Sequence, residues 1–230
     1  MYMDDYKRWL AADLEDPALT AELQKIEGQE EEIKDRFAVA LKFGTAGLRG
    51  VLGAGSNRMN IYVVRQATQG LANWVKTQGG NQLVAVSYDS RINSDVFAKE
   101  TAKVLAANGI KVRIYDALMP VPALSFATRY YEANAGVMVT ASHNPAEYNG
   151  YKAYNDEGCQ MSGDQADEVL HEIEKLDIFA DVKVAADDSA VNYIPQETID
   201  AYIAAVKKES TGFNGCKNLE VVYTALNGAG

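Results

Sequence analysis

Three short apolar runs, separated by stretches of helical periodicity, restrict the fold of this chain more than any other feature. The runs occupy residues 83–86, 112–115 and 137–139 and are rich in β-branched residues. Helical segments begin between them, near Ser94 and near Pro122. Runs that are apolar on both faces are typical of parallel strands covered by helices on each side. We therefore expect an α/β protein with a three-layer α/β/α arrangement and a mainly parallel, mixed sheet.

The flanking segments predict further helices around this core. Residues 2–40 have apolar faces with helical spacing, so N-terminal helices should precede the α/β region. Asn60 can cap the next helix, and two more amphipathic helices are expected at about 164–175 and 196–208. Between the N-terminal helices and the helix that Asn60 caps, residues 43–60 contain many glycines. They predict a long loop or hairpin whose backbone passes close to another group.

Composition narrows the class of protein. The chain has 230 residues, a formal net charge of −10 and only two cysteines, Cys159 and Cys216. The acidic balance argues against a general nucleic-acid or membrane binder, because such proteins gather Lys and Arg on one surface. Two isolated cysteines are too few for a disulfide framework, and neither a signal peptide nor a membrane span is recognisable. We expect a cytoplasmic protein.

The polar residues that could carry chemistry follow the strands. In a parallel sheet the ligand crevice lies beyond the carboxyl ends of the strands, which here are the loops at 88–93, 117–121 and 141–150. Ser142 follows a buried strand between small residues, and Pro145 restrains the backbone behind it. Successive amides in this loop could form an anion-binding concavity around the serine oxygen. The pattern predicts a nucleophilic serine that holds a phosphate, with an ordinary loop serine as the alternative.

A hydrolase triad is the first rival for this serine. The chain has only two histidines, of which His143 is adjacent to Ser142 and His171 lies on an acidic helix. Neither is an obvious general base for Ser142, and the glycine-flanked nucleophile elbow is absent. We therefore set this reading aside.

Five segments occur in order over nearly the whole chain from about residue 40: FGTAGLRG at 43–50, YDSR at 88–91, TASHNP at 140–145, NGYK at 149–152 and YTALNG at 223–228. Together they resemble the α-D-phosphohexomutase family of phosphoglucomutases and phosphomannomutases. NRMN at 57–60 and EYNGY at 147–151 look most similar to the phosphoglucomutase branch that also contains phosphopentomutases. The last of the five segments departs from the family, which often has Pro and His where this chain has Ala225 and Asn227.

The resemblance implies a domain organisation. Residues 1–40 would be a helical extension and residues 41–210 domain I with the phosphoserine loop. Residues 211–230 would open domain II with a strand at Leu219–Thr224. Domains II to IV would then be the partners of this chain. Because the family's aspartate-rich metal loop is not found here, the isolated chain should be inactive.

The resemblance also implies roles for individual residues. Ser142 would be the phosphoserine, and its phosphate would give one oxygen ligand to Mg²⁺. Lys152 would act in general acid-base catalysis, although on physical grounds a purely electrostatic role is equally open. Arg49 and Thr45 would contact a phosphosugar, and an ordinary surface arginine is the alternative for Arg49.

Four further loop positions complete the set. His143 and Asn144 are candidate substrate contacts, and His143 is as well explained as a structural loop residue. Asp89 and Arg91 follow another strand, and we interpret them as a buried ion pair that shapes the loop, with a substrate contact as the alternative.

The implied activity is a phosphosugar mutase of the glucose 1-phosphate to glucose 6-phosphate type. It would depend on Mg²⁺ and on a sugar 1,6-bisphosphate as primer and intermediate. Phosphopentomutase or phosphomannomutase specificity remains open. A non-catalytic phosphosugar-binding module is the alternative of a different class.

Overall fold

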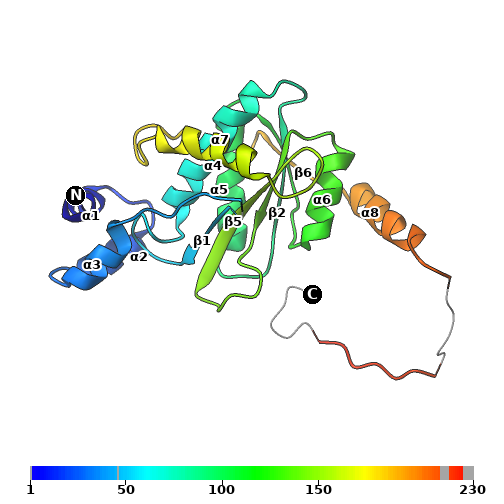
Figure 1. The fold of residues 1–230 in the computed structure, drawn as a ribbon, viewed down its shortest axis with the longest axis horizontal. Helices are drawn as coiled ribbons and strands as arrows, with labels where there is room; N and C mark the ends of the chain where they lie inside the picture. Colours follow the sequence, from blue (N-terminus) through cyan, green and yellow to red (C-terminus); the bar gives the residue numbers. More distant parts are fainter. Residues whose placement is uncertain (1, 46, 213–217, 225–230) are drawn as a thin grey trace.

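A single mixed sheet forms the centre of the computed structural model, which describes residues 2–45, 47–212 and 218–224. Its strand order in these residues is β1-β5-β4-β2-β3-β6 (Figure 1). Strands β4, β2, β3 and β6 are parallel. At one edge β5 pairs antiparallel with β4, and β1 pairs antiparallel with β5. The strands are β1 (Leu48–Val51), β2 (Leu83–Tyr88), β3 (Lys111–Ile114), β4 (Ala135–Val139), β5 (Tyr148–Tyr154) and β6 (Val191–Tyr193).

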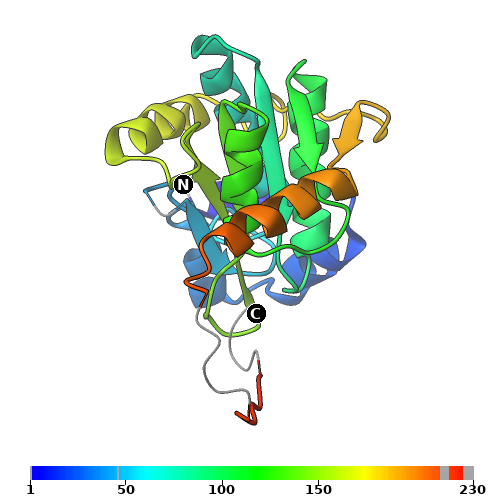
Figure 2. The same cartoon turned by 90° about the vertical axis from the view of Figure 1, so that its right-hand side faces the viewer.

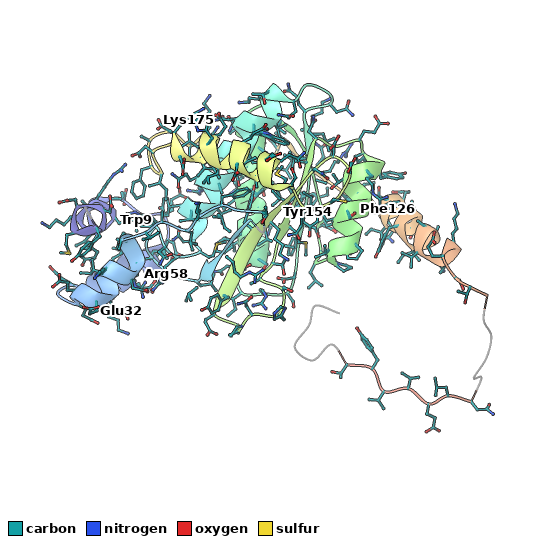
Figure 3. All side chains as sticks on the ribbon, in the orientation of Figure 1. Trp9, Glu32, Arg58, Phe126, Tyr154 and Lys175 are labelled. Atoms are coloured by element: carbon teal, nitrogen blue, oxygen red, sulfur yellow. The ribbon has the colours of Figure 1, made fainter. Side chains whose placement is uncertain are left out.

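Helices cover both faces of the sheet, which confirms the expected α/β/α layers (Figures 1 and 2). One face carries α4 (Ile61–Thr77), α5 (Ser94–Ala107) and α7 (Gly163–Glu174), whose apolar side chains pack on the sheet in the main core. The other face carries α6 (Val121–Tyr130) and α8 (Gln196–Lys208). Phe126 of α6, labelled in Figure 3, packs against Tyr202 of α8 with ring centroids 5.6 Å apart.

The helix starts follow the capping residues in the sequence. The side chain of Asn60 accepts a hydrogen bond from the amide of Val63 at 3.0 Å, as predicted for the cap of α4. Ser162 and Gln165 form a capping box at the start of α7. Helix α6 has proline at its first turn, where the missing amide hydrogen is not needed.

The central parallel strands place two loops side by side. Every residue of β2 and of β4 is buried, as expected for strands covered on both faces. Tyr88, the last residue of β2, is the register partner of Val139, the last residue of β4. The loops that begin at Asp89 and at Thr140 therefore leave the same edge of the sheet.

The N-terminal extension contains α1 (Tyr2–Ala11), α2 (Pro17–Lys25) and α3 (Glu30–Phe37), which lie beside α4 and β1 (Figure 1). Trp9 of α1, labelled in Figure 3, is 2% exposed. Its ring makes edge contacts with Phe37, Tyr62 and Phe179, with centroids 5.2 to 6.0 Å apart. The extension thus shares a core with the α/β region through Tyr62 and Phe179.

Two expectations change in the structure. The glycine-rich segment forms strand β1, which pairs with the distant β5. At Leu219–Thr224, where a strand was expected, the structure assigns neither helix nor strand and leaves the residues exposed. Cys216 and residues 225–228 of the last motif lie outside the described residues.

In the described residues, no helix has both the length and the apolar character that crossing a membrane requires.

Candidate functional site

Ser142 lies exposed on the loop that follows β4, as the sequence predicted for an accessible nucleophile. Its backbone has φ +57°, in the left-handed region that costs a residue with a side chain about 1 kcal/mol. The Oγ atom of Ser142 lies 3.3 Å from Nδ1 of His143. The neighbouring Ala141 is fully buried, so the loop is anchored directly beside the serine.

A buried carboxylate supports this loop from the side of the core. Asp89 is 5% exposed, and its Oδ2 accepts a hydrogen bond from the hydroxyl of Thr140 at 2.6 Å. The same hydroxyl oxygen accepts the amide hydrogen of Ser142 at 2.9 Å. The other oxygen of Asp89 accepts from the hydroxyl of Ser94 and from the amide of Arg91. Asp89 therefore connects the end of β2 to the backbone of Ser142.

Arg91 forms the ion pair that the sequence predicted. Its Nε lies 3.6 Å from Oδ2 of Asp89, and both side chains are largely buried. Its remaining nitrogens donate to the carbonyl oxygens of Ser142, Asn144, Pro145 and Tyr148. The predicted ion pair is thus confirmed, and it contacts the serine loop directly.

Two of the amides that could have formed the predicted anion-binding concavity are engaged within the loop. The amide of Ser142 donates to the hydroxyl of Thr140, and that of Asn144 donates to the carbonyl oxygen of Ala141 at 3.1 Å. These two amides are therefore not free to bind a phosphate in this conformation.

Two cations lie on the antiparallel edge beside the loop. Arg49 of β1 pairs with Gly150 of β5, and Lys152 follows Gly150 by two residues. Positions two apart on a strand share a face, so Arg49 and Lys152 lie on the same face of the sheet. Arg49 is exposed, and its Nη1 donates to the side-chain oxygen of Asn144 at 3.1 Å. This contact joins the β1 edge to the serine loop.

Lys152 is half-buried and electrostatically perturbed. Burial lowers the pKa of its ammonium, and the nearby charge of Arg49 lowers it further. Asp89 opposes these effects, because its carboxylate raises the pKa of Lys152. A lowered pKa makes the neutral amine, which can accept a proton, easier to form.

Glycines permit the close contact between these strands. A Cβ atom on Gly47, which has φ +74°, would lie 1.9 Å from the carbonyl oxygen of Tyr151. One on Gly150 would lie 2.6 Å from the carbonyl oxygen of Thr140. Real Cβ contacts are never this short, so side chains at these positions would push β1 and the serine loop away from β5. The close backbone approach predicted from the glycine density is confirmed.

The remaining candidates differ in how firmly the structure connects them to Ser142. His143 and Asn144 lie on the same loop and contact Ser142 and Arg49 respectively. Thr45 is exposed on the tight turn between Gly44 and Gly47, close to the start of α7. The structure gives Thr45 no contact with the other candidates in the described residues, so its role stays a prediction.

Mg²⁺ requires several oxygen ligands in near-octahedral geometry. Within the described residues, no three His, Cys, Asp or Glu side chains form a group that could hold a metal ion. Ser142 offers a single oxygen, through its hydroxyl or through a phosphate on it. The described residues therefore do not fit Mg²⁺ by themselves.

Two buried polar residues of this site, Thr140 and Asn149, had no role expected from the sequence. Thr140 carries the link between Asp89 and Ser142. Asn149 is fully buried and donates to the carbonyl oxygen of Ile92 and the hydroxyl of Ser94, which ties β5 to the loop after β2. Their positions inside the motifs TASHNP and NGYK, close to strand ends, are the sequence features that could have indicated a role for them.

Comparison with known proteins gives a consistent family. Residues 40–178 match the family model of phosphoglucomutase/phosphomannomutase, alpha/beta/alpha domain I. A phosphoglucomutase of Staphylococcus epidermidis is 37% identical over 202 residues, which cover 86% of this chain and 37% of that protein. A phosphoglucomutase of Staphylococcus aureus is 36% identical over 205 residues, which cover 87% and 37%.

The fold has relatives of known structure as well. A crystal structure from Thermus thermophilus, provisionally assigned as a phosphomannomutase, matches with a TM-score of 0.63 and 29% identity. The match covers 74% of this chain and 36% of that one. The chain thus spans little more than a third of the length of these relatives. Because the family model matches more than half of the sequence, the chain belongs to the phosphoglucomutase/phosphomannomutase family, with its α/β/α domain I at residues 40–178.

Proposed function

We propose that this chain is the phosphoserine-bearing part of a cytoplasmic phosphosugar mutase, with glucose 1-phosphate and glucose 6-phosphate as the first candidate pair. The observation that carries the proposal is the exposed Ser142 on a loop joined to Arg49. Lys152 lies on the same face of the sheet as Arg49. The related phosphoglucomutases support the reaction class.

The proposed reaction moves one phosphoryl group in each direction. The P–O bond on phospho-Ser142 breaks while a new P–O bond forms to a hydroxyl oxygen of the sugar phosphate. The hydroxyl proton passes to a base, for which Lys152 is the candidate because its pKa is lowered, and the released Ser142 oxygen takes up a proton to become a hydroxyl. The bisphosphate then reorients in the site. Its other phosphoryl group moves to the Ser142 oxygen, which gives up its hydroxyl proton, while the sugar oxygen that loses the phosphoryl group takes up a proton.

The cations of the site have a defined task in this reaction. Phosphoryl transfer spreads negative charge over the equatorial oxygens, and positioned positive groups stabilise it. Arg49 can present its planar fork to a phosphate at the edge of the loop, with Thr45, His143 and Asn144 as further substrate contacts.

Mg²⁺ and a sugar 1,6-bisphosphate primer belong to the same proposal. The phosphate on Ser142 would provide one ligand to the ion, and carboxylates outside this chain would provide the others. When bound, Mg²⁺ would neutralise charge on the transferring group. Domains II to IV would supply these carboxylates and the groups that select the sugar.

The test uses the complete protein with Ser142→Ala. We expect mutase activity on glucose 1-phosphate, assayed with Mg²⁺ and bisphosphate primer, to fall by at least about 10³-fold because no covalent acceptor remains. Ser189→Ala is the matched control: Ser189 is also exposed but precedes β6, at the opposite edge of the parallel sheet from Ser142. An undiminished rate in Ser142→Ala would refute the proposal.

A second candidate function concerns the chain alone. The missing metal group among the described residues favours a module that binds phosphosugar without turning it over. Calorimetric binding of glucose 1-phosphate to the 230-residue chain, together with no detectable turnover, is the expected result. Full mutase activity of the isolated chain would contradict it.

A further inference from the structure

The hydrogen bonds of Arg91 distinguish it from the other cations of the site. A guanidinium has five N–H groups, four on its two Nη atoms and one on Nε. Nη1 donates to the carbonyl oxygens of Pro145 and Tyr148 at 3.0 and 3.1 Å. Nη2 donates to those of Ser142 and Asn144 at 2.7 and 2.6 Å. With Nε facing Asp89 at 3.6 Å, every donor is directed at the protein itself.

This arrangement leaves Arg91 no donor for a ligand. Arg49 is the contrast, because it is exposed and its side chain makes a single hydrogen bond, to Asn144, in the described residues. The side chain of Arg91 is only 14% exposed. Arg49 therefore suits phosphate binding, whereas Arg91 suits the positioning of the loop.

The four carbonyl groups bound by Arg91 come from the whole length of the serine loop. They belong to residues from Ser142, close behind β4, to Tyr148, the first residue of β5. Ser142 itself is held at φ +57°, a conformation that a free loop would leave. The guanidinium binds the carbonyl oxygen of this residue, so it fixes the peptide plane next to the side chain.

We infer that Arg91 is a positioning residue whose guanidinium, oriented by Asp89, sets the loop conformation and thereby the direction of the Ser142 oxygen, without touching the phosphosugar. The inference rests on the proposed function for its catalytic consequence. Its structural part stands on the four carbonyl contacts alone. A lysine has one nitrogen and cannot reach four carbonyl oxygens at separate positions, so charge without the fork is not sufficient.

The first experiment uses the chain as it stands and needs no activity. Hydrogen exchange is measured on Arg91→Lys and on Arg129→Lys, where Arg129 is an exposed arginine of α6 that also donates to a backbone carbonyl. We expect amides in 140–150 to exchange on the order of tenfold faster in Arg91→Lys only, with α4 unchanged. Unchanged exchange in 140–150 would overturn the inference.

The second experiment measures kinetics in the complete protein. We expect Arg91→Lys to lower kcat about 100-fold and to leave KM within about twofold, because a misplaced nucleophile slows transfer without weakening binding. Free guanidinium should restore part of the rate of Arg91→Ala, whereas ammonium should not.

Two kinetic results would overturn the inference: retention of kcat in Arg91→Lys, or a raised KM with unchanged kcat, which would indicate substrate contact. Either result leaves the proposed function intact as long as Ser142→Ala is inactive. If Ser142→Ala is active, the proposed function fails, while the exchange experiment still decides the structural role of Arg91.

Discussion

At the scale of single residues, opposing electrostatic effects meet at Lys152. Burial and Arg49 lower the pKa of its ammonium, and Asp89 raises it. A phosphate on Ser142 would add another negative charge and raise the pKa again. The phosphate on Ser142 therefore opposes the base role proposed for Lys152 in the first transfer, and burial together with Arg49 must outweigh it.

This balance predicts the effect of removing one charge. Arg49→Gln eliminates a positive neighbour, so the pKa of Lys152 should rise toward its ordinary value, and the neutral fraction at any given pH should fall. Carbon NMR of the lysine Cε atom over a pH series in the isolated chain measures this. Arg129→Gln, which removes a charge that does not affect Lys152, is the control. A lower or unchanged pKa in Arg49→Gln would show that the two cations do not interact.

Residue chemistry could be predicted from the sequence where a motif lies directly after a strand. Ser142, Asp89 and Arg91 were correctly expected on neighbouring loops, because carboxyl ends of parallel strands meet at one edge of the sheet. The sequence could not predict that the hydroxyl of Thr140 connects Asp89 to the amide of Ser142. Nor could it predict that loop amides donate to acceptors within the loop. These hydrogen bonds depend on side-chain rotamers and on the φ of Ser142, which the residue types do not determine.

At the scale of elements, the contact between β1 and β5 brings the edge that carries Arg49 to the serine loop. The sequence indicated that the backbone near residues 43–60 passes close to another group, but it did not indicate that this group is strand β5. β1 is four residues long and pairs with a strand about a hundred positions away. Pairing at such a separation is set by tertiary packing, and local patterns do not encode it. Helices α4 and α7, by contrast, begin close to where the sequence predicted, after the caps Asn60 and Ser162.

Two glycines with similar backbone conformation allow a test of this contact. Gly47 and Gly28 have φ +74° and +77°, but a Cβ on Gly47 would lie 1.9 Å from the carbonyl oxygen of Tyr151, whereas one on Gly28 would meet nothing within 4 Å. Gly28→Ala should therefore cost about 1 kcal/mol of unfolding free energy from backbone strain alone. Gly47→Ala should cost clearly more, because β1 must move. Urea unfolding of both variants measures the difference, and equal losses would show that β1 adapts freely.

At the scale of the whole molecule, charged pairs join the N-terminal extension to the α/β region. Arg65 of α4 is buried and donates to Glu15 of the extension at 2.6 Å and to Glu100 of α5 at 2.6 Å. Arg8 binds Asp177 and lowers the pKa of this carboxyl to about 2. A lowered carboxyl pKa contributes stability that is present above its unfolded value and is lost as the pH falls through about 2. The pair of Arg8 and Asp177 is therefore intact at neutral pH.

Together with the aromatic contacts of Trp9, these links predict that the extension and the α/β region unfold together. The chain has two tryptophans, Trp9 in the extension and Trp74 in α4, so Trp9→Phe and Trp74→Phe each leave one reporter. Trp9 packs on Tyr62 and Phe179 of the α/β region. Unfolding of the extension would therefore expose Tyr62 and Phe179, and unfolding of the α/β region would expose Trp9. The two fluorescence transitions in urea should coincide after correction for the stability of each variant, measured by circular dichroism. A Trp9 transition at clearly lower urea than the circular dichroism transition of the same variant would show that the extension opens alone.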